Sequence, residues 1–143
     1  ASTIDRLIDI GVEPYLIASG VRGVISQRLV RKVCPHCREE YRPDPEEFEA
    51  VGLPYDPGVR FYRGSGCPMC FGTGYRGRTG VFEILVIDRA LRSRITGGAT
   101  REELKDAIER TGSFKTMEDS CRELVLTGAT TVEEARKTIT ALE

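Results

Sequence analysis

The sequence contains no tryptophan, a single histidine and no apolar run of the roughly 18 residues that a membrane-spanning helix needs. Its first residues lack the basic and then apolar pattern of a secretory signal peptide. The 21 basic and 22 acidic residues leave a net charge of -1, which argues against a nucleic-acid-binding protein. A chain of 143 residues with 40% apolar content is typical of one folded soluble domain or two small subdomains.

The chain begins without methionine and directly in a helical pattern, so we interpret it as an excised portion of a larger protein. Helices are predicted where apolar residues recur at helical spacing behind Asp or Thr caps, and strands where β-branched and apolar residues form short runs. The segments 100–103 and 131–134 both have the form of a capping box. Predicted helices cover 3–10, 14–18, 45–51, 88–94 and the segments after Thr100, Thr116 and Thr131, and predicted strands cover 24–31, 59–62 and 79–87.

Five cysteines are present, and four of them form two Cys-x-x-Cys pairs, Cys34 with Cys37 and Cys67 with Cys70. A Cys-x-x-Cys turn brings two sulfur atoms close enough to bind one ion, and two such turns supply the four tetrahedral ligands that zinc prefers. Glycines and basic residues flank the pairs, which favours amide-to-sulfur hydrogen bonds and thiolates. We therefore predict a structural zinc site and, because paired thiols of this kind stay reduced, a cytoplasmic location.

Other interpretations of the cysteines remain open. The pairs could be two redox-active dithiols, although a thioredoxin-like motif is a single pair between a strand and a helix. Iron would use the same four ligands. A catalytic zinc is disfavoured because four thiolates leave no open coordination position. His36, inside the first pair, is interpreted as a solvent-facing spacer, and Cys121 as a small core residue of its helix.

Four sequence segments follow one another in a recognisable order. They are residues 6–14, residues 27–31, the two cysteine pairs, and the run Gly-Arg-Thr-Gly-Val-Phe-Glu at 77–83. In this order they resemble the C-terminal part of the type II secretion and type IV pilus assembly ATPases. The resemblance covers nearly the whole chain and is strongest between residues 4 and 87. The related retraction ATPases lack the four cysteines.

The resemblance implies an α/β fold with three parts: the end of a RecA-like ATPase core, a tetracysteine zinc-binding subdomain and a C-terminal α-helical subdomain. It also implies a cytoplasmic hexameric motor that uses ATP and Mg²⁺ and acts at inner-membrane platform proteins. The sequence has no Gly-x-x-x-x-Gly-Lys-[Ser/Thr] phosphate-binding loop, so we expect no ATP hydrolysis by this chain alone. The implied boundaries are 1–33 for the core, 34–75 for the zinc subdomain, 76–87 for a strand returning to the core and 88–143 for the helical subdomain.

Arginines are the other candidate functional residues of the chain. The resemblance implies roles in ATPase activity or subunit contact for Arg6 and Arg78, and positions near the nucleotide for Gln27 and Arg28. Arg78 is expected in a glycine-flanked turn at 77–80, from which its guanidinium could reach a phosphate group. An exposed arginine, or one paired with a nearby carboxylate, is the competing interpretation.

Two other classes of zinc module are compatible with parts of the sequence. Residues 67–74 have the Cys-x-x-Cys-x-Gly-x-Gly form of chaperone zinc modules, but those modules carry four copies and this chain carries one. A nucleic-acid-binding zinc ribbon should present basic and aromatic residues on one face. Tyr62-Arg63 and Tyr75-Arg76 have that character, whereas the balanced total charge argues against it.

Overall fold

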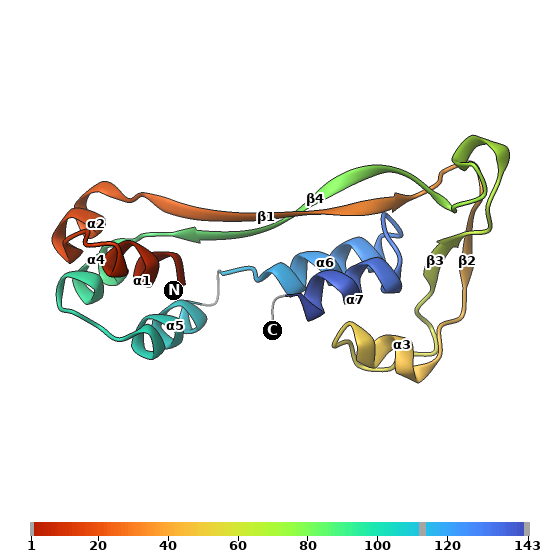
Figure 1. Cartoon of the computed structure of the whole chain (residues 1–143). Helices are drawn as coiled ribbons and strands as arrows, with labels where there is room; N and C mark the ends of the chain where they lie inside the picture. The colour runs from red at the N-terminus through yellow and green to blue at the C-terminus, as the bar shows by residue number, and fades with distance from the viewer. Residues whose placement is uncertain (1, 112–113, 142–143) are drawn as a thin grey trace. The chain divides into compact units, whose positions relative to one another are not determined.

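The computed structural model describes residues 2–111 and 114–141, which form a mixed α/β structure (Figure 1). None of the described helices is long and apolar enough to cross a membrane. The helices are α1 (Ser2–Asp9), α2 (Pro14–Gly20), α3 (Pro45–Ala50), α4 (Arg89–Thr96), α5 (Arg101–Arg110), α6 (Met117–Leu126), α7 (Val132–Thr140) and the short 3-10 helix η1 (Pro68–Cys70). The strands are β1 (Gly23–Val33), β2 (Arg38–Tyr41), β3 (Phe61–Gly64) and β4 (Tyr75–Val86).

The chain divides into two compact units. Unit 1 comprises Ala1–Ser26 and Glu83–Lys115, and unit 2 comprises Gln27–Phe82 and Thr116–Glu143. The residues predicted as one helical tail, 88–143, are therefore shared between the units, with α4 and α5 in unit 1 and α6 and α7 in unit 2.

Unit 1 is a group of helices around one aliphatic core. Asp88 begins α4, and its side chain accepts a hydrogen bond from Leu91 N. Thr100 begins α5 in a reciprocal capping box with Glu103. In both helices, side chains thus bond backbone N–H groups of the first turn that have no partner within the helix. The apolar faces of these helices can then turn inward. The buried core residues are Ile4, Ile17, Ala18, Leu85, Ile87, Leu91, Ile95, Leu104 and Ile108.

Unit 2 packs the helices α3, α6 and α7 with strand residues around a second core. Gly128, with a φ of +75°, ends α6 in the left-handed conformation that favours glycine and allows the chain to turn toward α7. The Ser120 hydroxyl of α6 donates to the Phe82 carbonyl oxygen of β4 at 2.6 Å. The buried core residues are Val30, Phe48, Val51, Phe61, Val81, Met117, Cys121, Val125, Val132 and Ala135.

The strands form two separate pairs. β1 pairs with β4, and β2 pairs with β3 in antiparallel register, with Tyr41 opposite Phe61 and Arg38 opposite Gly64. Because β2 starts directly after Cys37 and β3 ends shortly before Cys67, this register carries the two cysteine pairs to the same end of the ladder.

The structure differs from the sequence-based expectations in the strands. The Arg-Glu-Glu-Tyr sequence of β2 has no apolar alternation, so the sequence does not predict this strand. β4 begins at Tyr75, so residues 77–80 belong to a strand, and the predicted turn at these positions is wrong. Gly77 has a φ of +76° within β4, the conformation that a glycine uses in a strand bulge. Pairing with β1 thus outweighs the local preference of the glycines for a turn.

Candidate metal centre

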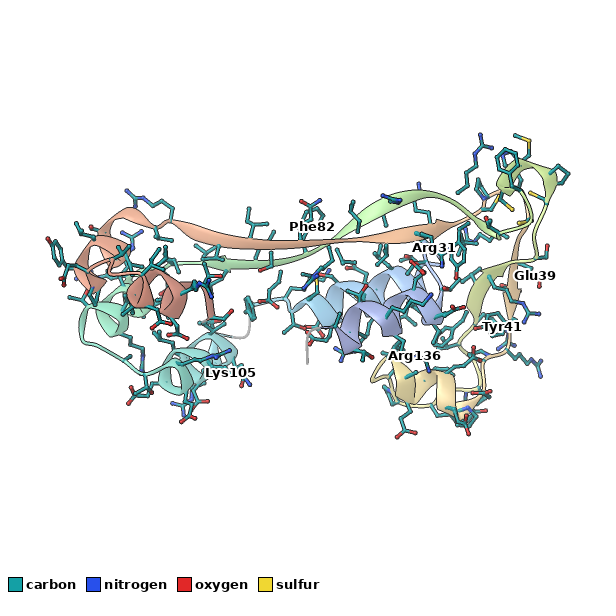
Figure 2. All side chains as sticks on the ribbon, in the orientation of Figure 1. Arg31, Glu39, Tyr41, Phe82, Lys105 and Arg136 are labelled. Atoms are coloured by element: carbon teal, nitrogen blue, oxygen red, sulfur yellow. The ribbon has the colours of Figure 1, made fainter. Side chains whose placement is uncertain are left out.

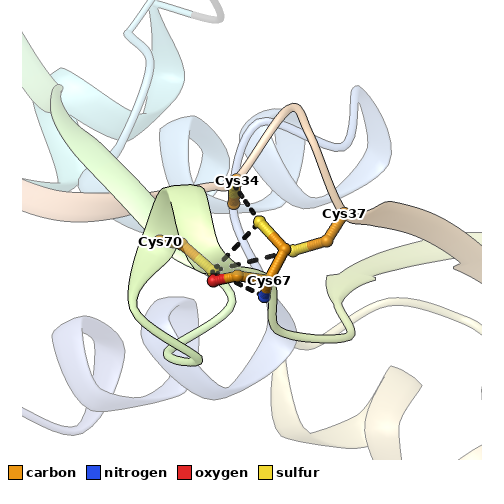
Figure 3. Close-up of side chains that lie close together, drawn as sticks. All are labelled: Cys34, Cys37, Cys67 and Cys70. Carbon is orange, nitrogen blue, oxygen red and sulfur yellow. Dashed lines mark hydrogen bonds between the residues drawn. The ribbon is translucent and has the colours of Figure 1, made fainter.

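Four cysteine side chains converge in unit 2 (Figure 3). Cys34 follows β1, Cys37 precedes β2, Cys67 is the residue before η1, and Cys70 ends η1. Their four Sγ atoms all lie within 4.8 Å of one another. The two Cys-x-x-Cys pairs therefore form one cluster that could hold a metal ion.

Three of the sulfur–sulfur distances match the edge of a tetrahedral thiolate site. The Sγ–Sγ distance is 3.8 Å for Cys34 and Cys67, 3.8 Å for Cys37 and Cys70, and 3.7 Å for Cys67 and Cys70. A zinc–sulfur bond of about 2.3 Å gives a tetrahedron with an edge of about 3.8 Å. A disulfide would need about 2.0 Å, and all four thiols are free. The donor set thus fits one four-coordinate ion.

Backbone N–H groups point at the sulfur atoms. The N–H of Gly66 donates to Cys37 Sγ at 3.3 Å, and those of Cys67 and Gly74 donate to Cys70 Sγ at 3.2 Å. Burial raises the pKa of the Cys70 thiol, but its two amide donors and the thiols of Cys67 and Cys37 together outweigh this effect, and the pKa is lowered to about 6. At Cys37, burial prevails over the single donor and the pKa is raised to about 11. A bound cation would favour the thiolate at both residues.

Gly74 connects the two cysteine pairs through its backbone. Its carbonyl oxygen accepts from Cys34 N at 2.9 Å, while its own N–H donates to Cys70 Sγ. Gly74 has a φ of +77°, and a Cβ at this position would lie 2.5 Å from the Gly64 carbonyl oxygen. Real Cβ atoms essentially never make so close a contact, so only glycine fits here.

The loop between α6 and α7 holds the end of β1, next to the first cysteine pair. The Val33 N–H donates to the Ala129 carbonyl oxygen at 3.0 Å, and the Thr130 hydroxyl donates to the Arg31 carbonyl oxygen at 2.7 Å. Glu134 of α7 accepts from Arg31 N at 3.0 Å and from Arg31 Nη2 at 2.7 Å. These bonds fix the backbone that leads into Cys34.

The carboxylate of Glu134 consequently does not complete the capping box predicted at 131–134. The Thr131 hydroxyl still accepts from Glu134 N at 3.2 Å, but the Glu134 side chain turns to Arg31, labelled in Figure 2. Arg31 offers the carboxylate a charged donor and a backbone N–H together, whereas the capping bond would offer one neutral amide. The Arg31 guanidinium also lies 4.0 Å from the centre of the Tyr75 ring, and the Tyr75 hydroxyl lies 2.8 Å from Thr131 Oγ1.

His36 and Cys121 lie outside the sulfur cluster. His36 is exposed, and its Nε2 accepts from Arg76 Nη1 at 3.1 Å. Cys121 is fully buried in the apolar core of unit 2, as the sequence predicts, and burial raises the pKa of its thiol to about 11.

The remaining predicted site residues are exposed. Arg6 lies on α1 of unit 1, Gln27 and Arg28 lie on β1, and Arg78 lies on β4, the last three in unit 2. Within residues 2–111 and 114–141, no ion pair or side-chain hydrogen bond involves Arg6, Arg28 or Arg78. Their roles therefore stay predictions, and Arg78 would act from a strand instead of the expected turn.

Known proteins similar to the chain are secretion and pilus assembly proteins. A sequence model of the family described as "Type II/IV secretion system protein" matches residues 1–137. The chain is 44% identical over 136 residues to the type IV pilus assembly ATPase PilB of Thermus thermophilus, which covers 94% of this chain and 15% of that protein. It is 41% identical over 131 residues to the type II secretion system protein E of Pseudomonas aeruginosa, which covers 92% of this chain and 26% of that protein.

A third relative, the type II secretion system ATPase E of Vibrio cholerae, is 38% identical over 134 residues, which is 94% of this chain and 26% of that protein. The chain thus spans no more than about a quarter of the length of these relatives.

Proposed function

Because this chain belongs to the type II/IV secretion system protein family, we propose that it is the zinc-binding C-terminal portion of a cytoplasmic ATPase motor for type II secretion or type IV pilus assembly. One combination carries the proposal: a cluster of four cysteines that could hold a metal ion occurs in a chain similar to ATPases of both systems. The parts of the proposal are argued separately below.

Zinc is proposed as a structural ion. Cys34, Cys37, Cys67 and Cys70 would hold it, and the amides of Gly66, Cys67 and Gly74 would stabilise their thiolates. Zn²⁺ bound by four thiolates supplies folding free energy and offers no open position for water or substrate. The ligands join the end of β1, the start of β2 and the segment before β4, so the ion would fix three strands at one point.

ATP and Mg²⁺ are proposed to bind other parts of the full-length protein. Residues 1–33 and 76–87 would complete its RecA-like core, residues 34–75 would form the zinc subdomain and residues 88–143 the helical subdomain. Phosphoryl transfer needs phosphate-cradling amides, magnesium ligands and a positioned nucleophile, and the sequence contains no phosphate-binding loop. This chain alone would therefore not hydrolyse ATP.

Subunits of the same protein are the proposed partners of the exposed arginines. Arg6 and Arg78 are exposed and form no ion pair with the described residues, so each is available to a neighbouring subunit or to a phosphate in a hexameric ring. Gln27 and Arg28 are proposed to lie near the nucleotide. The ring would act at inner-membrane platform proteins and lie at the membrane through them.

The two tyrosines of the nucleic-acid-binding alternative each keep at most one ring face free for a base. Base stacking needs a free aromatic face. The Arg38 guanidinium lies 4.1 Å from the Tyr62 ring centre and the Arg31 guanidinium 4.0 Å from that of Tyr75, so an arginine covers one face of each ring.

The proposal is tested in a bacterium whose chromosomal copy of the full-length gene carries Cys34→Ser or Cys67→Ser, with Cys121→Ala as the matched cysteine control. We expect both serine variants to lose zinc and either secretion or surface pili, and the control to retain both. Normal secretion and piliation by a zinc-free serine variant would overturn the structural role of the ion. If secretion and piliation both stayed normal after deletion of the gene, the assignment to a type II secretion or type IV pilus motor would be overturned.

A further inference from the structure

Phe71 is the most exposed large apolar side chain described in the chain, at 92%, and it directly follows the ligand candidate Cys70. It is also the only non-glycine residue with a positive φ within the described residues. Its φ and ψ are 53° and 40°, a left-handed conformation that a Cβ disfavours. The turn after η1 needs this backbone conformation, which Gly or Asn would adopt more easily. The fold gives no reason for a phenyl ring there, because the ring is almost wholly in solvent.

A hollow of about 440 Å³ lies beside this ring. It is lined by the second cysteine turn, including the half-exposed Met69, and by the start of β4, including Arg76. Apolar side chains and one guanidinium thus border the same depression. A depression of this kind accepts a side chain, whereas a flat bilayer surface would touch Phe71 and leave the hollow unfilled.

A second hollow, of about 380 Å³, shares Arg76 with the first. Lys32 and Arg38 also line it, and none of the described residues that line either hollow is acidic. Lys32 forms no ion pair with a described residue, and its Cδ lies beside Gly77, a lining residue of the first hollow. Three positive charges next to an apolar hollow complement a ligand that carries negative charge beside an apolar group.

We propose that the two hollows and Phe71 form a docking surface for an acidic protein segment with an apolar anchor residue. The anchor enters the hollow between Phe71 and Arg76, and neighbouring carboxylates pair with Lys32, Arg38 and Arg76. The surface lies entirely in unit 2, and the inference is independent of the proposed ATPase role.

A library of random dodecapeptides displayed on phage is the probe. The zinc-loaded chain is the target, and the Phe71→Asn chain is the counter-selection target. Asparagine tolerates the left-handed backbone, so this variant removes the ring without adding strain. We expect enrichment, on the original chain alone, of peptides with acidic residues beside an aliphatic or aromatic one.

Fluorescence anisotropy then gives the dissociation constant of the most enriched peptide. Phe71→Asn and Lys32→Glu should each weaken binding about tenfold or more, and added salt should weaken it further. The controls are Leu126→Asn on α6 and Arg136→Glu on α7 (Arg136 is labelled in Figure 2). They change an exposed apolar residue and an exposed cation that line neither hollow, and they should leave binding unchanged.

Zinc content and the circular dichroism spectrum of every variant separate loss of the surface from loss of the fold. The same enrichment on the original and Phe71→Asn chains, or enrichment of neutral or basic peptides, would overturn the proposal. So would Phe71-dependent binding to phosphatidylglycerol vesicles without peptide binding, which would make the surface a membrane contact. If the Lys32→Glu variant lost its zinc but bound the peptide with unchanged affinity, the basic side chains would serve only to offset the negative charge of the thiolates.

Discussion

Glu134 accepts two hydrogen bonds from Arg31, one from the backbone N–H at 3.0 Å and one from the guanidinium at 2.7 Å. The two residues are 103 positions apart, and only 10% of the Glu134 side chain is exposed. Because Cys34 lies three residues after Arg31, this contact lets α7 of unit 2 support the strand that enters the sulfur cluster.

Glu134→Ala should destabilise unit 2, because it leaves the Arg31 amide without its partner in a half-buried site. We expect a loss of about 1–3 kcal/mol in the free energy of unfolding and a Tm lower by at least about 4 °C. Glu133→Ala is the control, since Glu133 is exposed and its only ion pair with a described residue is to Lys137, and its effect should stay within about 0.5 kcal/mol. Equal thermal unfolding of the two variants would contradict a special role of the Arg31 contact.

The same contact predicts an acid dependence of stability. Burial raises the pKa of the Glu134 carboxyl, but the hydrogen bonds from Arg31 and the charges of Arg31 and Lys137 together outweigh burial, so its pKa in the folded chain lies below the ordinary value of about 4.3. The stabilisation is therefore complete above that value and is lost as the pH falls through the folded-state pKa. In denaturant titrations between about pH 5 and pH 3, the original chain should lose stability more steeply than Glu134→Ala. Parallel pH profiles would show that Glu134 does not titrate in this way.

Metal removal should unfold the region around the sulfur cluster more than unit 1. Native mass spectrometry should find one zinc ion per chain, and a chelator should lower the melting temperature.

Hydrogen exchange of Cys67→Ser should show loss of amide protection concentrated between residues 34 and 75, with α4 and α5 least affected, because their caps and core lie in unit 1. Cys121→Ala should retain the metal. An unchanged melting curve in chelator would argue against a structural ion.

The purified chain should show no ATP turnover above background, because its sequence supplies no phosphate-binding loop. The full-length protein, assayed under the same conditions, is the positive control. Phosphate release that follows the chain through two further chromatographic steps would refute this expectation.

Arg78→Ala in the full-length protein should lower ATP turnover on the order of a thousandfold while zinc content and Tm stay unchanged. Arg78 is exposed and forms no ion pair with a described residue, so its removal costs little folding free energy. Arg78→Lys should fail almost as badly, because lysine cannot make the two parallel hydrogen bonds of a guanidinium to a phosphate. Arg136→Ala is the control for loss of an exposed arginine. Normal turnover of Arg78→Lys would remove Arg78 from the candidates for catalysis.

Features that depend on nearby residues could be predicted from the sequence. Asp44, Thr100 and Thr116 cap α3, α5 and α6 because each hydroxyl or carboxylate needs only the amide three positions later. The same holds for each Cys-x-x-Cys pair, whose spacing alone brings two sulfur atoms together. The preference of zinc for four thiolates then predicts that the two pairs meet, and their Sγ atoms do lie within 4.8 Å.

The tertiary structure decided the features that depend on remote partners. Glu134 has the sequence context of a capping residue, and only the approach of β1 to α7 gives it a guanidinium as a stronger partner. Residues 77–80 have the glycines of a turn, and pairing with β1 draws them into a strand. The sequence by itself therefore determined the ligand candidates and most helix starts, because short-range hydrogen bonds control them. The support of Cys34 was decided by the packing of distant segments, whose contact energies no local pattern contains.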